Sequence, residues 1–223
     1  MKNNRNFLFY GIGSVAFGIK GNAFSWFLFF YYNMVIGLPA WMASLALAIA
    51  TIWDAISDLI IGYSSDHTKS RLGRRHPYMY AALIPVPIFF VLLWNPPTFD
   101  TDFNLFLYLL IMAILVRTFT TLFEIPNQSL GPEITREYHE RTKMMSLRYF
   151  FGWMGGTVMT ILMYFVFLKP TVEYPNGQLN PEGYQIYGIV AAIIMLVAMI
   201  CLLYTSDAAD EGLGVDLGGR RII

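Results

Sequence analysis

The stretch Ile52-Trp53-Asp54-Ala55-Ile56-Ser57-Asp58 places two acids inside an apolar run that extends from about residue 40 to residue 61. A run of about 20 apolar residues is long enough to cross a bilayer. Asp54 and Asp58 are four residues apart, so both carboxylates lie on one face of a helix. A carboxylate at membrane depth is costly, is usually paired, and usually marks an ion or substrate path. We interpret Asp54 and Asp58 as cation ligands; the alternative is a structural pair with a neighbouring basic residue.

The composition is that of a polytopic helical membrane protein. Hydrophobic residues make up 56% of the 223 residues and charged residues 13%, whereas soluble domains have about 45–50% and about 25%. The formal net charge of zero gives no global basic field that would favour nucleic acid. Cys201 is the only cysteine, which excludes a disulfide framework and a thiolate metal site. Because no zinc-protease helix or nucleophile elbow occurs either, we expect neither an enzyme nor a cofactor.

Six apolar stretches predict an all-α membrane protein with six transmembrane helices. They cover about residues 7–36, 40–63, 78–94, 103–123, 144–168 and 184–204. Pro85 and Pro87 predict a kink in the third helix. Gly152 and Gly156 give the fifth a small-xxx-small face for close contact with another helix.

The basic residues of the loops predict the orientation in the membrane. Lys and Arg occur before the first helix, in the loop between helices two and three, and in the loop between helices four and five. The loops between helices one and two and between helices three and four have none, and the loop before helix six has only Lys169. Because cytoplasmic loops carry the excess of basic residues, we expect a multi-pass protein of the cell (inner) membrane with a cytoplasmic N-terminus.

Residues 201–223 differ in character from the rest. They read CLLYTSDAADE, followed by a glycine-rich stretch that ends GRRII. The string resembles the in-frame translation of a sequencing adapter more than natural protein sequence. We therefore expect a six-helix bundle over residues 1–200, followed by a non-native tail over residues 201–223 that is to be excluded from reasoning about the fold. The alternative is an ordinary polar cytoplasmic tail.

Further polar side chains fall within the apolar segments. Arg117, Thr121 and Glu124 are spaced i, i+4 and i+7, so they line one face of the fourth helix. Arg148 lies near the start of the fifth helix and Lys20 within the first. Hydroxyl and carboxylate oxygens suit a hard cation such as sodium, and a carboxylate beside a guanidinium supplies the acceptors and donors that a sugar needs. Alternatively, Lys20 and Arg117 form structural ion pairs with the acids of helices two and four.

The loop between helices two and three holds the most specific motif. It reads GYSSDHTKSRLGRR over residues 62–75 and resembles the cytoplasmic signature of the major facilitator superfamily. The alternative is a loop that is merely positive, but the spacing of its glycines, acid and arginines argues against that. By this resemblance, a conformational latch on the cytoplasmic side comprises Gly62, Asp66, Arg71, Gly73 and Arg74.

Together, the segment 52–58, this loop and Glu124-Ile125-Pro126 resemble the glycoside–pentoside–hexuronide:cation symporters, the melibiose permease family. The runs at residues 10–13 and 138–142 are also similar to members of that family, and the resemblance covers about residues 7–200. It implies the N-terminal six-helix half of a major facilitator fold, with a C-terminal six-helix half still required. It also implies a secondary active transporter that binds sugar and cation at the midplane and works by alternating access.

The resemblance assigns roles to particular residues. Asp54, Asp58 and Thr121 match the ligands of the coupling cation, sodium in the first instance. Glu124 and Arg148 match residues that bind the sugar.

One departure from the family lies in the first helix. The aspartate that binds galactosides in the family falls at Gly18, which argues against galactoside specificity, and Asn22, one turn away, offers a replacement polar group. Lys20 raises the alternative that protons or a fixed internal cation replace sodium. The expected partners are therefore a small sugar or glycoside, sodium or protons, and the lipid bilayer, but no nucleic acid. A non-transporting sugar sensor or scaffold on the same fold and an uncoupled sugar uniporter are the alternatives.

Overall fold

The computed structural model describes residues 2–68, 70, 74–134 and 137–212, and these residues contain helices and no strand. The first helical segment comprises α1 (Lys2–Ile12), α2 (Val15–Asn22), the π-helix η1 (Ala23–Phe27), α3 (Leu28–Phe30) and the π-helix η2 (Tyr31–Val35). It is followed by α4 (Ala40–His67), α5 (His76–Leu83), α6 (Pro85–Trp94), α7 (Asp102–Ile134), α8 (Tyr138–Leu162), η3 (Met163–Phe167) and α9 (Pro181–Gly212). The prediction of an all-α fold is confirmed.

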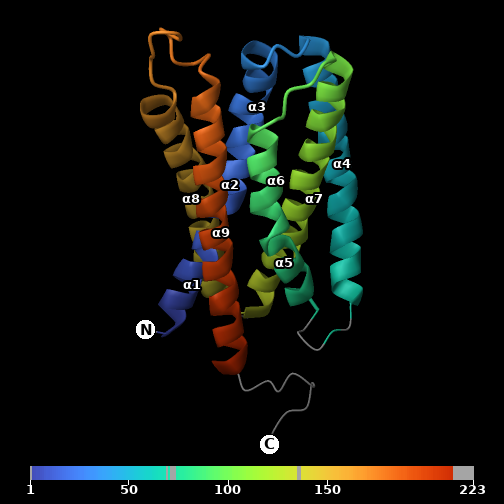
Figure 1. Cartoon of the computed structure of the whole chain (residues 1–223). Coiled ribbons are helices and arrows are strands. Elements are labelled where there is room, and N and C mark those ends of the chain that lie inside the picture. Colours follow the sequence, from blue (N-terminus) through green and yellow to red (C-terminus); the bar gives the residue numbers. More distant parts are fainter. Residues whose placement is uncertain (1, 69, 71–73, 135–136, 213–223) are drawn as a thin grey trace, which may run out of the picture.

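The helices run alternately up and down through one bundle (Figure 1). Five helical stretches are long and apolar enough to cross a membrane: residues 40–67, 76–94, 102–129, 138–167 and 181–203. The first helical segment makes a further passage from the end where α1 begins to the end where α4 begins. As Figure 1 shows, α4, α7 and α9 end on the side where α1 begins, which is the arrangement that the distribution of basic residues requires.

The first predicted helix, over residues 7–36, is not one continuous α-helix. The chain leaves the helix at Gly13 and Ser14, and two π-helical turns, η1 and η2, interrupt it further on. A π-helical turn inserts an extra residue and is frequent at functional sites. The apolar character of this segment was therefore read correctly, but its regularity was not.

Proline has opposite effects in two other helices. The helix is interrupted at Ile84, directly before Pro85, as the two prolines of this segment predict. In contrast, α7 continues through Pro126 to Ile134, although its end was expected near residue 123. Proline is tolerated inside a membrane helix because neighbouring helices can satisfy the freed carbonyl. Glu124 therefore lies within a helix and not at its end.

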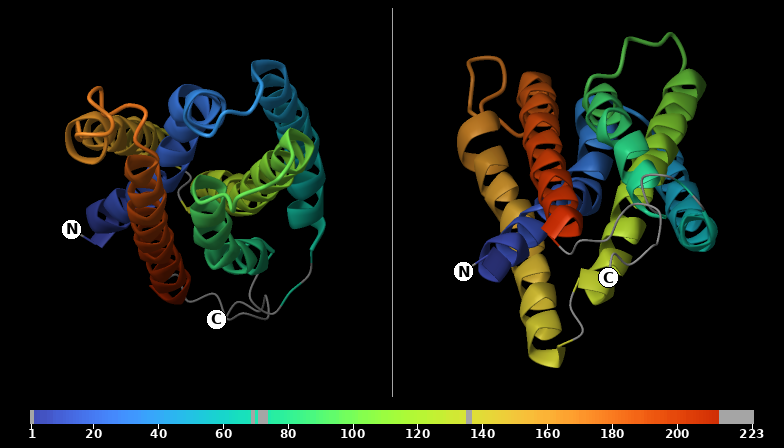
Figure 2. Two further views of the ribbon diagram at one scale, coloured as in Figure 1. Left: turned by 45° about the horizontal axis from the view of Figure 1, so that its top comes forward. Right: turned by 90° about the horizontal axis from the view of Figure 1, so that it is seen from below.

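The bundle consists of two groups of helices. The first helical segment packs on α8 and α9, whereas α4 and α5 pack on α7, and the contact of α6 with α9 joins the two groups. Figure 2 shows α4, α5, α6 and α7 on one side and α8 and α9 on the other. The arrangement leaves α7 between α4 and the centre of the bundle.

A buried aromatic cluster holds the groups together near the end where α4 begins. The Tyr31 hydroxyl donates to the carbonyl oxygen of Trp94 at 3.1 Å, and the Tyr32 hydroxyl donates to that of Leu93 at 2.8 Å. The Tyr31 ring stacks on Tyr184 with 4.7 Å between centroids. Because these rings are fully or almost fully buried, the cluster fixes the first helical segment against α6 and α9.

Small residues allow α2 and α8 to cross closely. A Cβ atom built on Gly18 would lie 1.7 Å from the carbonyl oxygen of Gly152, and one on Gly156 would lie 2.6 Å from the carbonyl oxygen of Gly18. The Asn22 side chain donates to Thr160 Oγ1 at 3.0 Å beside this crossing. The small-xxx-small face predicted for the fifth helix is confirmed, and its partner is α2.

We expect Gly18→Ala to destabilise the protein and Gly21→Ala to leave its stability unchanged. The first change forces two helix backbones apart, whereas a Cβ on Gly21 meets nothing within 4 Å. Overpacking costs about 1–3 kcal/mol, so the unfolding midpoint of the detergent-solubilised full-length protein should fall by roughly 5 °C in the first variant. Equal midpoints for the two variants would show that α2 and α8 are not in close contact.

Candidate cation and substrate site

Asp54 lies at the meeting point of three helices. Its Oδ1 atom accepts a hydrogen bond from Thr121 Oγ1 of α7 at 3.3 Å. Its Oδ2 atom accepts from Lys20 Nζ of α2 at 3.4 Å and from the Arg117 guanidinium of α7. The Lys20, Arg117 and Asp54 side chains are 8%, 13% and 19% exposed. The structure thus brings together Asp54 and Thr121, and it shows the ion pairs that were considered for Lys20 and Arg117.

The position of Arg117 is fixed by more than Asp54. Its second terminal nitrogen donates to Thr51 Oγ1 at 3.2 Å. Its guanidinium carbon lies 4.8 Å from the centre of the Phe24 ring, close enough for a cation–π interaction. These contacts join Arg117 of α7 to α4, through Thr51, and to the first helical segment, through Phe24. The contact of α4 with α7 is also the most extensive helix contact in the described chain.

Asp58, the second predicted cation ligand, has a different environment. It lies one turn beyond Asp54 on α4, but its side chain is exposed. The same helix exposes Ile52, Ile56 and Leu59 on this part of its surface. The sequence spacing placed both acids on one helical face, but in the structure α7 contacts only the first of them, which is half-buried.

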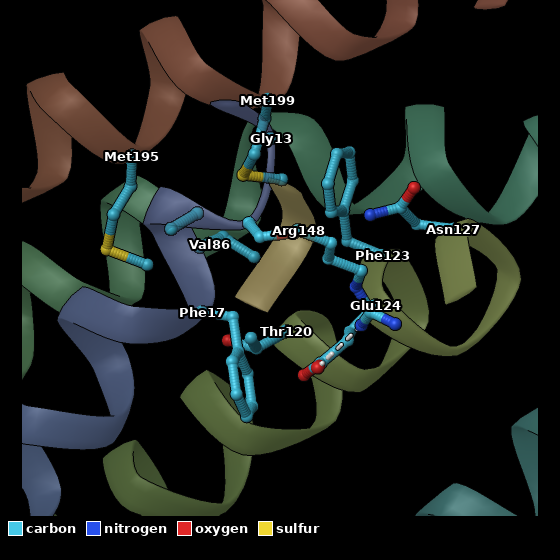
Figure 3. Close-up of a pocket in the computed structure, with 12 residues that line it drawn as sticks. Gly13, Phe17, Val86, Thr120, Phe123, Glu124, Asn127, Arg148, Met195 and Met199 are labelled. Carbon is cyan, nitrogen blue, oxygen red and sulfur yellow. Dashed lines mark hydrogen bonds and ion pairs between the residues drawn. The ribbon is translucent and has the colours of Figure 1, made fainter. Parts of the chain in front are cut away.

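Glu124 and Arg148 form an ion pair between α7 and α8. Arg148 Nη2 lies 3.1 Å from Glu124 Oε1, and the two side chains are 8% and 17% exposed. The two residues proposed as sugar ligands therefore contact each other directly (Figure 3). A carboxylate and a guanidinium in one place offer both acceptors and donors to a ligand hydroxyl.

A small cavity lies beside this pair. Its walls come from the first helical segment and from α6, α7, α8 and α9, through Gly13, Ser14, Ala16, Phe17, Val86, Thr120, Phe123, Glu124, Asn127, Arg148, Met195 and Met199. Its free space of about 10 Å³ has room for roughly one water molecule. In the arrangement seen here, the pair is closed and a sugar has no room beside it.

Two unpaired polar atoms add to the polar character of the cavity. Ser14 Oγ and Asn127 Oδ1 are buried and have no hydrogen-bond partner among the described residues. Buried polar groups are normally hydrogen-bonded, so two such atoms at one cavity point to a polar ligand or water there. Sequence reasoning missed both residues. Ser14 follows the Tyr10–Gly13 run and Asn127 follows Glu124-Ile125-Pro126, so their closeness to recognised motifs was the available signal.

Gly18 and Asn22 do not lie at this cavity. The structure places Gly18 against the α8 backbone and pairs Asn22 with Thr160. Their surroundings are those of residues that let two helices approach closely. The substitution of an aspartate at Gly18 would require α2 and α8 to separate.

The predicted latch is described only in part. Arg71 and Gly73 lie outside the described residues. Asp66 forms an ion pair with Arg75, with Arg75 Nη2 3.2 Å from Asp66 Oδ1, so an arginine outside the predicted set pairs with the acid of the motif. Arg75 is the last of the arginines in this loop, and no feature of the motif distinguishes the arginine that pairs with Asp66 from its neighbours. Gly62 lies inside α4, where an added Cβ would reach only Ile125 at 3.7 Å.

Comparison with known proteins agrees with a transport function. Residues 9–212 match the family model described as MFS/sugar transport protein. An uncharacterized symporter of Synechocystis is 32% identical over 92% of this chain and 37% of its own length. The inner membrane symporter YicJ of Escherichia coli is 27% identical over 90% and 43%, and the isoprimeverose transporter of Lactiplantibacillus pentosus is 27% identical over 86% and 38%. The chain spans about two fifths of the length of these relatives.

We expect the Glu124–Arg148 pair to behave as one energetic unit. Glu124→Gln leaves the buried Arg148 guanidinium without its carboxylate, and Arg148→Gln leaves the half-buried Glu124 carboxylate without its guanidinium. Breaking a buried pair from one side costs about 3–5 kcal/mol. The double variant should lose about 0.5–3 kcal/mol less than the sum of the single variants, measured by unfolding of the purified full-length protein.

Glu173→Gln provides the control for this cycle, because it makes the same chemical change in an exposed residue of the loop before α9. Its unfolding midpoint should match that of the unmodified protein. Strictly additive losses in the cycle would show that Glu124 and Arg148 do not interact.

Proposed function

The chain belongs to the MFS/sugar transport protein family, and on that premise we propose that it forms the N-terminal six-helix half of a sugar:cation symporter. The substrate would be a glycoside, pentoside or hexuronide, and the coupling ion sodium or a proton. A second six-helix half would complete the transporter, because the relatives are more than twice as long as this chain. The protein would lie in the cell membrane with its N-terminus in the cytoplasm.

The observation that carries this proposal is the small interior cavity beside the Glu124–Arg148 ion pair. It combines an ion pair, Glu124–Arg148, with two unpaired polar atoms of Ser14 and Asn127. Sugar hydroxyls both donate and accept hydrogen bonds, so they match a carboxylate, a guanidinium, a hydroxyl and an amide oxygen. Apolar side chains of Phe17, Met195 and Met199 form other parts of the wall, as is typical of small-molecule sites.

The closed ion pair suggests how substrate binding would alter the protein. A sugar that enters between Glu124 and Arg148 replaces their contact by hydrogen bonds to its own hydroxyls. Such a ligand favours the arrangement in which α7 and α8 are further apart, because it binds only there. Rocking of this half against the second half would then expose the site on the other side of the membrane.

The cytoplasmic loop after α4 would act as the latch of the outward-open state. The Asp66–Arg75 pair joins the end of α4 to the residue before α5. The other proposed members are Gly62, Arg71, Gly73 and Arg74. A pair that forms in one state and separates in the other biases the equilibrium by the energy of that contact alone.

A sensor or an uncoupled uniporter is less well supported. The relatives are named symporters and transporters, and the interior acids that ion coupling requires are present in this chain.

We expect the full-length protein to accumulate a sugar in cells, and the double variant Glu124→Gln/Arg148→Gln to lose that uptake. The double variant is chosen because it leaves no unpaired charge in the bundle. A hydrogen bond to a charged group contributes about 1.5–3 kcal/mol, so uptake should fall at least about 10-fold. The measurement is initial uptake of labelled galactosides, pentosides and hexuronides, normalised to the amount of protein in the membrane.

Glu173→Gln again serves as the matched control and should transport like the unmodified protein. Sugar binding without uptake would favour the sensor. Undiminished uptake in the double variant would remove Glu124 and Arg148 from the substrate site.

A further inference from the structure

Both carboxylate oxygens of Asp54 already accept hydrogen bonds from groups of the chain itself. Oδ1 accepts from Thr121, and Oδ2 accepts from Lys20 at 3.4 Å and from Arg117. A sodium ion bound to Asp54 would need these oxygens as ligands, since sodium is coordinated by oxygen atoms. The nitrogen cations of Lys20 and Arg117 cannot share that coordination shell, because they are donors and carry the same sign of charge.

The charges that neighbouring helices cover in the described membrane segments already include more cations than anions. Asp54 and Glu124 are half-buried among three cations, Lys20, Arg117 and Arg148, whereas the Asp58 side chain is exposed. A bound sodium ion would add a further positive charge at membrane depth, where an unpaired charge is strongly disfavoured.

Lys20 is the better match to a mobile monovalent cation. Arg117 is held by Thr51 and by the Phe24 ring as well as by Asp54. Lys20 reaches Asp54 from α2, a helix that otherwise makes little contact with α4, and its ammonium also lies 5.8 Å from the centre of the Phe17 ring. Its ammonium is a compact charge on a flexible stem, and it is buried, at 6% exposure of the residue.

From these contacts we infer that the Lys20 ammonium, supported by Arg117, takes the place at Asp54 that a coupling sodium ion would occupy, so that sugar uptake by this protein does not require sodium. The inference rests on the proposed function, because it concerns the ion dependence of the proposed transport. It selects among the coupling ions that the family resemblance leaves open. It also gives a reason for the combination of Lys20 and Arg117 with the acid of the Ile52–Asp58 segment.

The experiment compares sugar uptake by the full-length protein in sodium medium and in choline medium. The unmodified protein should take up sugar equally in both. Lys20→Gln removes one interior cation and vacates one position at Asp54, so its uptake should become several-fold greater in sodium than in choline. Lys169→Gln makes the same chemical change at an exposed loop position and should remain indifferent to sodium. Sodium-stimulated uptake by the unmodified protein would overturn the inference.

A second measurement decides the question even where Lys20→Gln does not transport. Sodium that binds the folded protein raises its unfolding midpoint by mass action. Sodium chloride should therefore raise the midpoint of purified Lys20→Gln by a few degrees relative to choline chloride, and leave the unmodified protein and Lys169→Gln unchanged. The absence of any sodium-specific shift in Lys20→Gln would overturn the inference. Absence of sugar uptake by the unmodified protein in both media would instead count against the proposed transport function, and the midpoints would still report on the sodium site.

Discussion

A charge inside a membrane needs a partner of opposite sign, and this requirement organises the interior of the bundle. The free-energy cost of transferring a lone ion to a medium of low polarity is far larger than the stabilisation that one helix contact provides. In this chain the charged side chains form two groups, one around Asp54 and one formed by Glu124 and Arg148. Each group draws its members from different helices, so each acid meets a base only when the helices are assembled. The same contacts that satisfy the charges therefore also specify the packing.

The helices around these groups differ in how closely and how extensively they pack against one another. The crossing of α2 and α8 is close because Gly18 and Gly152 carry no side chain. α7 packs extensively on α4 but meets α8 at few positions. The Glu124–Arg148 pair thus bridges a sparse contact, whereas Asp54 lies in a dense one. A contact that consists of few side chains is the natural place for a ligand to enter and for a structure to open.

Much of this arrangement can be predicted from the sequence, and the parts that cannot be predicted have identifiable physical reasons. The lengths of the apolar runs predict the membrane helices, and the spacing of four residues predicts that Asp54 and Asp58 lie on one face of their helix. That rule does not say which of the two acids a neighbouring helix covers, because burial depends on packing between segments far apart in the chain. Pro126 was taken as a helix end since its local preference disfavours helix, and tertiary contacts overrode it. The unpaired oxygens of Ser14 and Asn127 could not be predicted from the sequence, because only the structure shows which polar atoms lack a partner.

The arrangement of α7 gives the proposed transporter a physical route between its two sites. Arg117 and Thr121 bond to Asp54, and Glu124, on the same face of the same helix, bonds to Arg148. A helix transmits displacement along its axis because its backbone hydrogen bonds hold it rigid. A sugar that separates Glu124 from Arg148 frees α7 from α8, and any resulting shift of α7 changes the distances from Arg117 and Thr121 to Asp54. Coupling of this kind needs no direct contact between the sugar and the groups around Asp54, only one element whose position both sites depend on.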